Sequence, residues 1–119
     1  EDIDCIFANA NSTQIADRSE VKAIHEVFGA YASKVPVTAV KSMVGECYSA
    51  SGFMATSAAL GALCHDFIPP TVGFNEKDPA CNVDCVPHEA REQKLQHVLI
   101  NSIDPNGSNS CVILKRHES

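Results

Sequence analysis

The sequence lacks tryptophan, and it is poor in aromatic residues (6%) and in positive charge, with 9 Lys and Arg against 15 Asp and Glu. Its net charge of −6 argues against a surface that follows phosphates, so no nucleic-acid partner is expected. The longest uncharged run, 47–64, is broken by Ser, Thr and Gly, so we expect no membrane contact. No basic and then apolar leader opens the sequence, so no signal peptide is expected, and the cytoplasm is the expected location.

What is present fits one modest α/β domain that occupies residues 1–119. With 45% hydrophobic and 20% charged residues, the composition is that of an ordinary globular protein. Six scattered cysteines are expected to be buried thiols of a reducing compartment, with a disulfide framework as the less favoured alternative. Cys81, Cys85 and His88 form an incomplete set of zinc ligands, so neither a metal nor another cofactor is expected.

The first part of the chain predicts a strand, a helix and a second strand. Ile3–Ala8 is apolar enough for a strand buried on both faces. Asp17 and Glu20 have the spacing of a capping box, and apolar residues then recur at helical spacing until the stretch 29–34. Val35–Val40 predicts the second strand.

The second part predicts a tightly packed helix, a long loop and a hairpin. Ser49–Phe67 consists largely of small residues, so this helix needs close neighbours, and Pro69-Pro70 is expected to end it. Thr71–Lys94 is expected to be mostly irregular. The last two strands, His97–Ile103 and Ser110–Lys115, are separated by a strong turn signal. The predicted order is therefore β-α-β-α-loop-β-β.

These landmarks resemble those of the β-ketoacyl-acyl-carrier-protein synthases over nearly the whole chain. Ser12-Thr13 resembles the end of the family's Ala-His-Gly-Thr motif, and Lys41-Ser42 followed by Gly45 resembles Lys-Ser-x-x-Gly-His. Three later blocks match in order and spacing: Ile68-Pro69-Pro70-Thr71, Asp78-Pro79 to Ala90-Arg91, and Asn101-Ser102 to Asn109. Several landmarks in one order are more specific than any single short motif.

The resemblance implies a thiolase-like fold, of which this chain is a partial, C-terminal piece. The half that carries the family's nucleophilic cysteine is absent here, and none of the six cysteines matches it. The strand that opens the C-terminal half is also expected to be missing, which would separate the first two strands from the last two and leave backbone unpaired. We therefore expect the chain to be incomplete without a companion N-terminal ketosynthase-like fragment, whether the division is genetic or proteolytic.

Two positions depart from the family's catalytic motifs. Aligned on these motifs, the two histidines that would stabilise an enolate correspond to Asn9 and Glu46. Asn9 can donate a hydrogen bond, but it cannot exchange a proton near neutral pH. An ionised Glu46 about 4 Å from the enolate would repel it by roughly 4 kcal/mol, which corresponds to about three decades in rate.

Further departures surround the lysine of this motif, Lys41, which is retained. The family's carboxylate partner for that lysine corresponds to Ala55, so the partner is expected to be missing. The glycine-rich gate loop corresponds to Asp104, Pro105, Asn106 and Gly107, in which proline fixes φ and lacks an N–H group. Asn9 and Glu46 are either relics without function or groups that pair with Lys41.

The leading hypothesis is a non-catalytic subunit like a chain length factor of type II polyketide or fatty-acyl biosynthesis. Such a subunit would supply interface and tunnel shape to an active ketosynthase, and an acyl carrier protein would be a further partner. An alternative is a repurposed thiolase-fold acyltransferase or hydrolase whose nucleophile lies in the missing half, with Glu46 as base or orienting carboxylate. A second alternative is the product of a truncated pseudogene.

Overall fold

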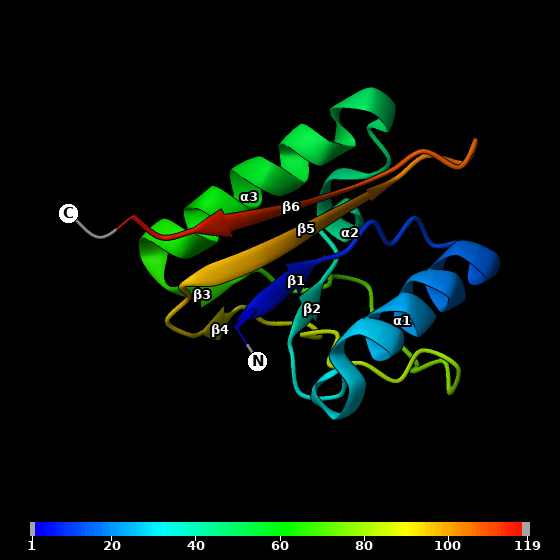
Figure 1. Cartoon of the computed structure of the whole chain (residues 1–119), viewed down its shortest axis with the longest axis horizontal. Helices are drawn as coiled ribbons and strands as arrows, with labels where there is room; N and C mark the ends of the chain where they lie inside the picture. Colours follow the sequence, from blue (N-terminus) through cyan, green and yellow to red (C-terminus); the bar gives the residue numbers. More distant parts are fainter. Residues whose placement is uncertain (1, 118–119) are drawn as a thin grey trace.

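The computed structural model describes residues 2–117, which form a mixed sheet with a helix on each face (Figure 1). The elements in order are β1 (Cys5–Phe7), α1 (Gln14–Phe28), β2 (Val37–Thr38), α2 (Lys41–Val44), α3 (Ser51–His65), β3 (Phe67–Ile68), β4 (Arg91–Glu92), β5 (His97–Ile103) and β6 (Asn109–Lys115). Short 3₁₀ turns cover Gly29–Tyr31 and Tyr48–Ala50. The predicted order β-α-β-α-loop-β-β is therefore correct, with α2, β3 and β4 as additions.

The four main strands lie in the order β2-β1-β5-β6. β1 pairs in parallel with both β2 and β5, and the register places Ile6 opposite Val37 on one side and Leu99 on the other. β5 and β6 form an antiparallel hairpin. The expectation that the first two strands would be separated from the last two is wrong, because β1 pairs directly with β5 and no backbone edge is left unpaired between them.

Residues of β1 are buried alternately on the two faces of the sheet. Cys5 and Phe7 pack in the cluster that includes the small-residue helix α3, whereas Ile6 packs in the cluster under α1. All three side chains have zero exposure. A strand covered on both faces needs an unbroken apolar run, and the sequence predicted this burial correctly.

Helix α1 begins four residues earlier than the capping-box pattern predicts, since that pattern makes Asp17 the N-cap. Thr13 is the N-cap and its carbonyl accepts the N–H of Asp17 at 2.9 Å, but no side chain caps the helix. Glu20 does not reach back to the helix start, because its carboxylate binds the loop after β1 instead. The helix ends at Phe28, where Gly29 takes a φ of 54°.

Helix α3 presents its small residues to the sheet. Ala55, Ala59, Ala62 and Leu63 are buried in the cluster that contains β1 and β5, which brings the helix backbone close to the strands. The helix is shorter than expected, since Asp66 in a left-handed conformation ends it. Pro69-Pro70 therefore does not terminate the helix but follows β3. None of the described residues lies in a helix long and apolar enough to cross a membrane.

The long segment after α3 is irregular, as expected, except where β4 pairs with β3. The guanidinium of Arg91 holds both carboxylate oxygens of Asp84, at 2.5 and 2.9 Å. The backbone carbonyl of Asp84 in turn accepts the N–H of Val37 in β2, at 2.7 Å. This ion pair fastens the loop to the edge of the main sheet.

Candidate functional site

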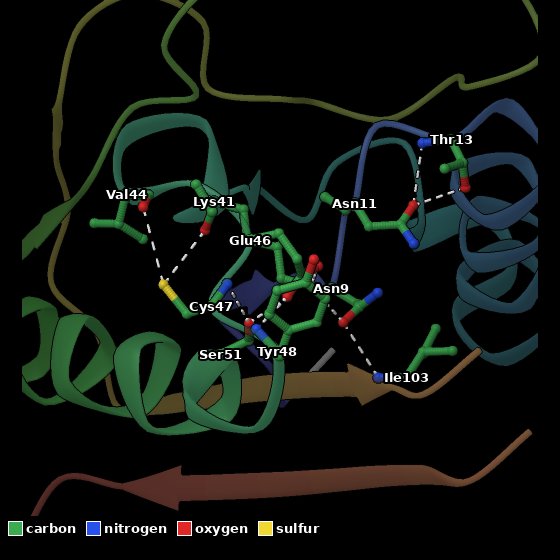
Figure 2. Close-up of polar contacts among 12 residues, drawn as sticks. Asn9, Asn11, Thr13, Lys41, Val44, Glu46, Cys47, Tyr48, Ser51 and Ile103 are labelled. Atoms are coloured by element: carbon green, nitrogen blue, oxygen red, sulfur yellow. Dashed lines mark hydrogen bonds and ion pairs between the residues drawn. The ribbon is translucent and has the colours of Figure 1, made fainter. Parts of the chain in front are cut away.

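Asn9, Lys41 and Glu46 come together beyond the carboxyl ends of the parallel strands β1 and β2. Asn9 lies two residues after β1, and Lys41 begins α2, which follows β2. Glu46 follows Gly45, whose φ of 79° ends α2 and turns the chain back toward Lys41. Figure 2 shows these side chains pointing toward one another.

The ammonium of Lys41 joins the other two side chains. Its Nζ donates to Asn9 Oδ1 at 2.9 Å and lies 2.9 Å from Glu46 Oε2. The Lys41 side chain is only 14% exposed, whereas that of Glu46 is 40% exposed. Of the two interpretations of Asn9 and Glu46, the structure agrees with pairing to Lys41.

The orientation of the Asn9 amide is determined by two donors. Oδ1 accepts both the Lys41 ammonium and the backbone N–H of Ile103, the latter at 3.2 Å. Neither donor can pair with an NH₂ group, so the carbonyl oxygen must face them and Nδ2 must point elsewhere. Asn9 is 4% exposed, and it therefore acts here as a buried neutral acceptor.

Glu20 holds the loop that carries Asn9. Its carboxylate accepts the backbone N–H groups of Asn9 at 2.8 Å and Ala10 at 2.9 Å. It also accepts the amide Nδ2 of Asn101 in β5, at 3.1 Å. This buried carboxylate thus ties α1, the β1 loop and β5 together. The capping-box spacing predicted a helix-cap role for Glu20 instead, and no local pattern in the sequence indicates its bonds to the β1 loop and to Asn101.

Glu46 is held in its ionised form. The hydroxyl of Ser51 donates to Oε1 at 2.6 Å, and the backbone N–H of Tyr48 donates to the same atom at 2.8 Å. The Ser51 hydrogen bond, followed by the Lys41 ammonium, lowers the pKa of Glu46 to about 2. The expected repulsion of an enolate assumed an unpaired carboxylate. Its pairing with Lys41 reduces that repulsion, so the earlier figure of three decades is an upper limit.

The family's carboxylate partner of Lys41 is missing at Ala55, as expected, but Glu46 supplies a carboxylate to Lys41 from a different position. Ala55 does lie nearby, since it lines the same small hollow as Asn9 and Lys41. This hollow has a volume of about 10 Å³, which is no more than one water molecule needs. Within the described residues, then, the polar groups satisfy one another, and this hollow is too small to hold an acyl group.

The segment Asp104, Pro105, Asn106 and Gly107 lies apart from this cluster, at the tip of the β5–β6 hairpin (Figure 1). It is closed on itself: Gly107 N–H donates to the Asp104 carbonyl at 2.9 Å, and Asn106 N–H donates to the Asp104 carboxylate at 2.7 Å. Gly107 has a φ of 94°. All four residues are exposed, and none lines the hollow around Asn9.

The cysteines do not behave as one class. Cys5 is buried, and burial raises the pKa of its thiol to about 12, so it stays protonated. Cys64 and Cys111 are exposed and the other three are partly exposed, so the expectation that all six thiols are buried holds for Cys5 alone. All six are free thiols, and no cluster of three metal-ligating side chains occurs within residues 2–117.

A larger hollow of about 350 Å³ lies between α1 and the irregular segment after α3. Asp17 lines it, and burial, together with the neighbouring Glu20, raises the pKa of the Asp17 carboxyl. Asn9, Lys41 and Glu46 do not line this hollow.

Residues 1–75 match the family model described as "Beta-ketoacyl synthase, C-terminal domain". Among curated proteins, the chain is similar to 3-oxoacyl-[acyl-carrier-protein] synthase 2 of Coxiella burnetii, with 38% identity over 98% of this chain and 28% of the relative. It is equally similar to both ketoacyl synthase subunits of the tetracenomycin polyketide synthase of Streptomyces glaucescens. The identities are 37% for the alpha subunit and 36% for the beta subunit, over 98% of this chain and 27% and 28% of those proteins.

Among solved structures, the chain is similar to "The ishigamide ketosynthase/chain length factor", with a TM-score of 0.94 and 36% identity. The match covers 98% of this chain and 28% of that one. The described residues thus form a partial thiolase-like fold that corresponds to its C-terminal part. The chain spans just over a quarter of the length of these relatives.

Proposed function

The chain belongs to the β-ketoacyl synthase family as a C-terminal domain, and from this membership we propose that it serves as a non-catalytic, chain-length-factor-like subunit. In this proposal the domain occupies residues 1–119 and pairs, through a companion N-terminal fragment, with an active ketosynthase. It supplies interface and tunnel shape in type II polyketide or fatty-acyl biosynthesis, and an acyl carrier protein delivers the substrate.

One observation carries the proposal. The positions that correspond to the family's two catalytic histidines hold Asn9 and Glu46, and both are engaged by Lys41 in a closed set of hydrogen bonds. An amide fixed as an acceptor and a carboxylate with a pKa of about 2 are unsuited to stabilising an enolate. The retained scaffold around them supports a structural role.

The acyltransferase or hydrolase alternative requires Glu46 to accept a proton or to orient a nucleophile. A general base works best when its pKa lies near the working pH, and Glu46 is several units below it. Its two oxygens are also already occupied by Ser51, Tyr48 and Lys41. These contacts favour the non-catalytic subunit over the base.

Exposed apolar side chains support a companion chain. Phe53 and Leu60, seven residues apart on α3, are 78% and 50% exposed, and therefore lie on one side of that helix. Val112 and Ile113 on the edge strand β6 are 48% and 57% exposed. Apolar surface of this kind on helix and edge strand is suited to burial against another chain.

The proposal is tested by reconstituting condensation from an acyl carrier protein, a malonyl donor, an active ketosynthase and this chain with its companion. Asn9→Ala and Glu46→Ala variants are compared with the unchanged chain, and assembly is followed by size-exclusion chromatography. We expect both variants to retain condensation wherever the complex assembles. If either abolishes condensation in an assembled complex, the non-catalytic proposal is wrong.

The enzymatic alternative has its own readout. Intact-protein mass spectrometry after incubation with acyl donors would detect a stable acyl group on the companion N-terminal fragment. Such acylation, lost in the Glu46→Gln variant, would favour the acyltransferase or hydrolase.

A further inference from the structure

Lys41 is a largely buried cation with one charged and one neutral acceptor. Its side chain is 14% exposed, and its Nζ contacts Glu46 Oε2 and Asn9 Oδ1 at 2.9 Å each. A buried ammonium without a counter-charge is strongly destabilising, because its lost hydration is not replaced. Of these two contacts, only Glu46 supplies that charge.

The second acceptor, Asn9, occupies a place where an extra charge would be unfavourable. It is 4% exposed, and its own backbone N–H is bound to the Glu20 carboxylate at 2.8 Å. With Glu46 and Glu20 both close by, a third carboxylate at position 9 would meet two negative charges and one positive charge. A neutral side chain is therefore favoured at position 9 while Glu46 is present.

We infer that Asn9 and Glu46 are coupled through Lys41, so that Lys41 requires one carboxylate and accepts it from either position. Lys41 is a positioning residue that fixes the Asn9 amide, and Glu46 is the group that keeps Lys41 there. A substitution at position 9 or at position 46 therefore changes which side-chain charge is favourable at the other position. This inference does not depend on the proposed function, because it concerns only the contacts of the three side chains.

An isosteric exchange tests the coupling. Glu46→Gln removes the carboxylate, Asn9→Asp adds one at the other acceptor, and the double variant N9D/E46Q has the wild-type net charge and nearly the same shape. Urea unfolding of the purified chain at pH 7, with its companion if the two are purified as a complex, gives the unfolding equilibrium constant for each. Each single variant should raise this constant tenfold or more. Glu46→Gln leaves the largely buried Lys41 ammonium without a carboxylate, and Asn9→Asp gives it two.

The unfolding equilibrium constant of the double variant should be at least tenfold smaller than the value obtained by multiplying the two single-variant effects. The control pair is N11D/E26Q, which changes the same residue types at a partly exposed and an exposed position. Asn11 Oδ1 accepts from Thr13, and Glu26 lies 3.8 Å from Lys22. The effects of this control pair should be small and additive. Rescue confined to N9D/E46Q would show that the position of the charge beside Lys41, and not composition, is responsible.

Two results would overturn the inference: additive effects of N9D and E46Q, or an unchanged stability in E46Q alone. If the single variants do not fold, recovery of a folded N9D/E46Q protein, judged by circular dichroism, supports the coupling. Failure of the double variant together with both singles counts against it.

Discussion

The Glu20 carboxylate and the Asn9 backbone are joined by a hydrogen bond of 2.8 Å between residues eleven positions apart. The same carboxylate also binds Ala10 N–H and Asn101 Nδ2. Glu20→Ala should therefore destabilise the protein by about 3 kcal/mol or more, because it leaves buried donors without an acceptor. Denaturant unfolding measures this loss. The matched control, Glu26→Ala on the exposed side of the same helix, should cost less than about 1 kcal/mol, and equal effects of the two would contradict the assigned role.

The Ser51 hydroxyl should control the titration of Glu46. The pKa of Glu46 is lowered from 4.5 to about 2 in the folded protein, so its stabilising contribution is fully present above pH 4.5 and is lost as the pH falls toward 2. Ser51→Ala removes the largest cause and should raise the pKa of Glu46. A carboxyl ¹³C NMR titration of Glu46 would follow the shift directly.

The control for this titration is Ser33→Ala, since the Ser33 hydroxyl contacts only a backbone carbonyl, at 3.5 Å. This variant should leave the Glu46 midpoint near 2. An unchanged midpoint in Ser51→Ala would show that the hydrogen bond to Ser51 does not hold the carboxylate ionised.

The irregular segment after α3 should loosen when its bidentate ion pair is weakened. Arg91 binds both oxygens of Asp84 and lowers the pKa of that carboxyl, and a lysine cannot reproduce two parallel hydrogen bonds. Arg91→Lys should cost about 1 kcal/mol, since the pair is partly exposed, and should accelerate proteolysis between residues 71 and 90. Arg18→Lys, at an exposed single contact with Asp78, is the control and should leave the cleavage rate unchanged. Equal cleavage in the two variants would argue against the role of Asp84.

The cysteines should separate by reactivity in the native chain. Cys64 and Cys111 are exposed and should be alkylated by iodoacetamide first, whereas Cys5, with a pKa of about 12, should be protected until unfolding. Peptide mass spectrometry before and after addition of urea distinguishes these classes. Alkylation of Cys5 at the rate of Cys64 in native conditions would be inconsistent with its position between two packed layers.

Local signals predicted the elements whose boundaries depend on neighbouring residues alone. The bounds of β5 are those expected for His97–Ile103, and β6 begins one residue earlier than expected, because turn residues separate two alternating apolar runs. The start of α1 was missed because Glu20 forms its bonds with the β1 loop, a partner distant in sequence. No local pattern identifies that competition.

The candidate site was predicted by position but not by contact. The motif spacing singled out Asn9, Lys41 and Glu46, and pairing with Lys41 was one of two alternatives. The sequence could not decide between these alternatives, because the turn at Gly45 that brings Glu46 back to Lys41 is not visible in the motif. Likewise, the β1–β5 pairing depends on sheet topology, which spacing along the chain does not determine.

The parallel pairing of β1 with β5 has a consequence for how the chain acquires its structure. Residues 5–7 must wait for partners at 98–100, so more than ninety residues have to be synthesised before the centre of the sheet can close. Contacts between residues this far apart in the sequence slow folding. The chain must lose the conformational entropy of the intervening loop before the strand pairing stabilises the structure. During that interval the apolar β1 segment has only β2 as a partner strand, which makes the nascent chain a candidate for chaperone binding on the ribosome.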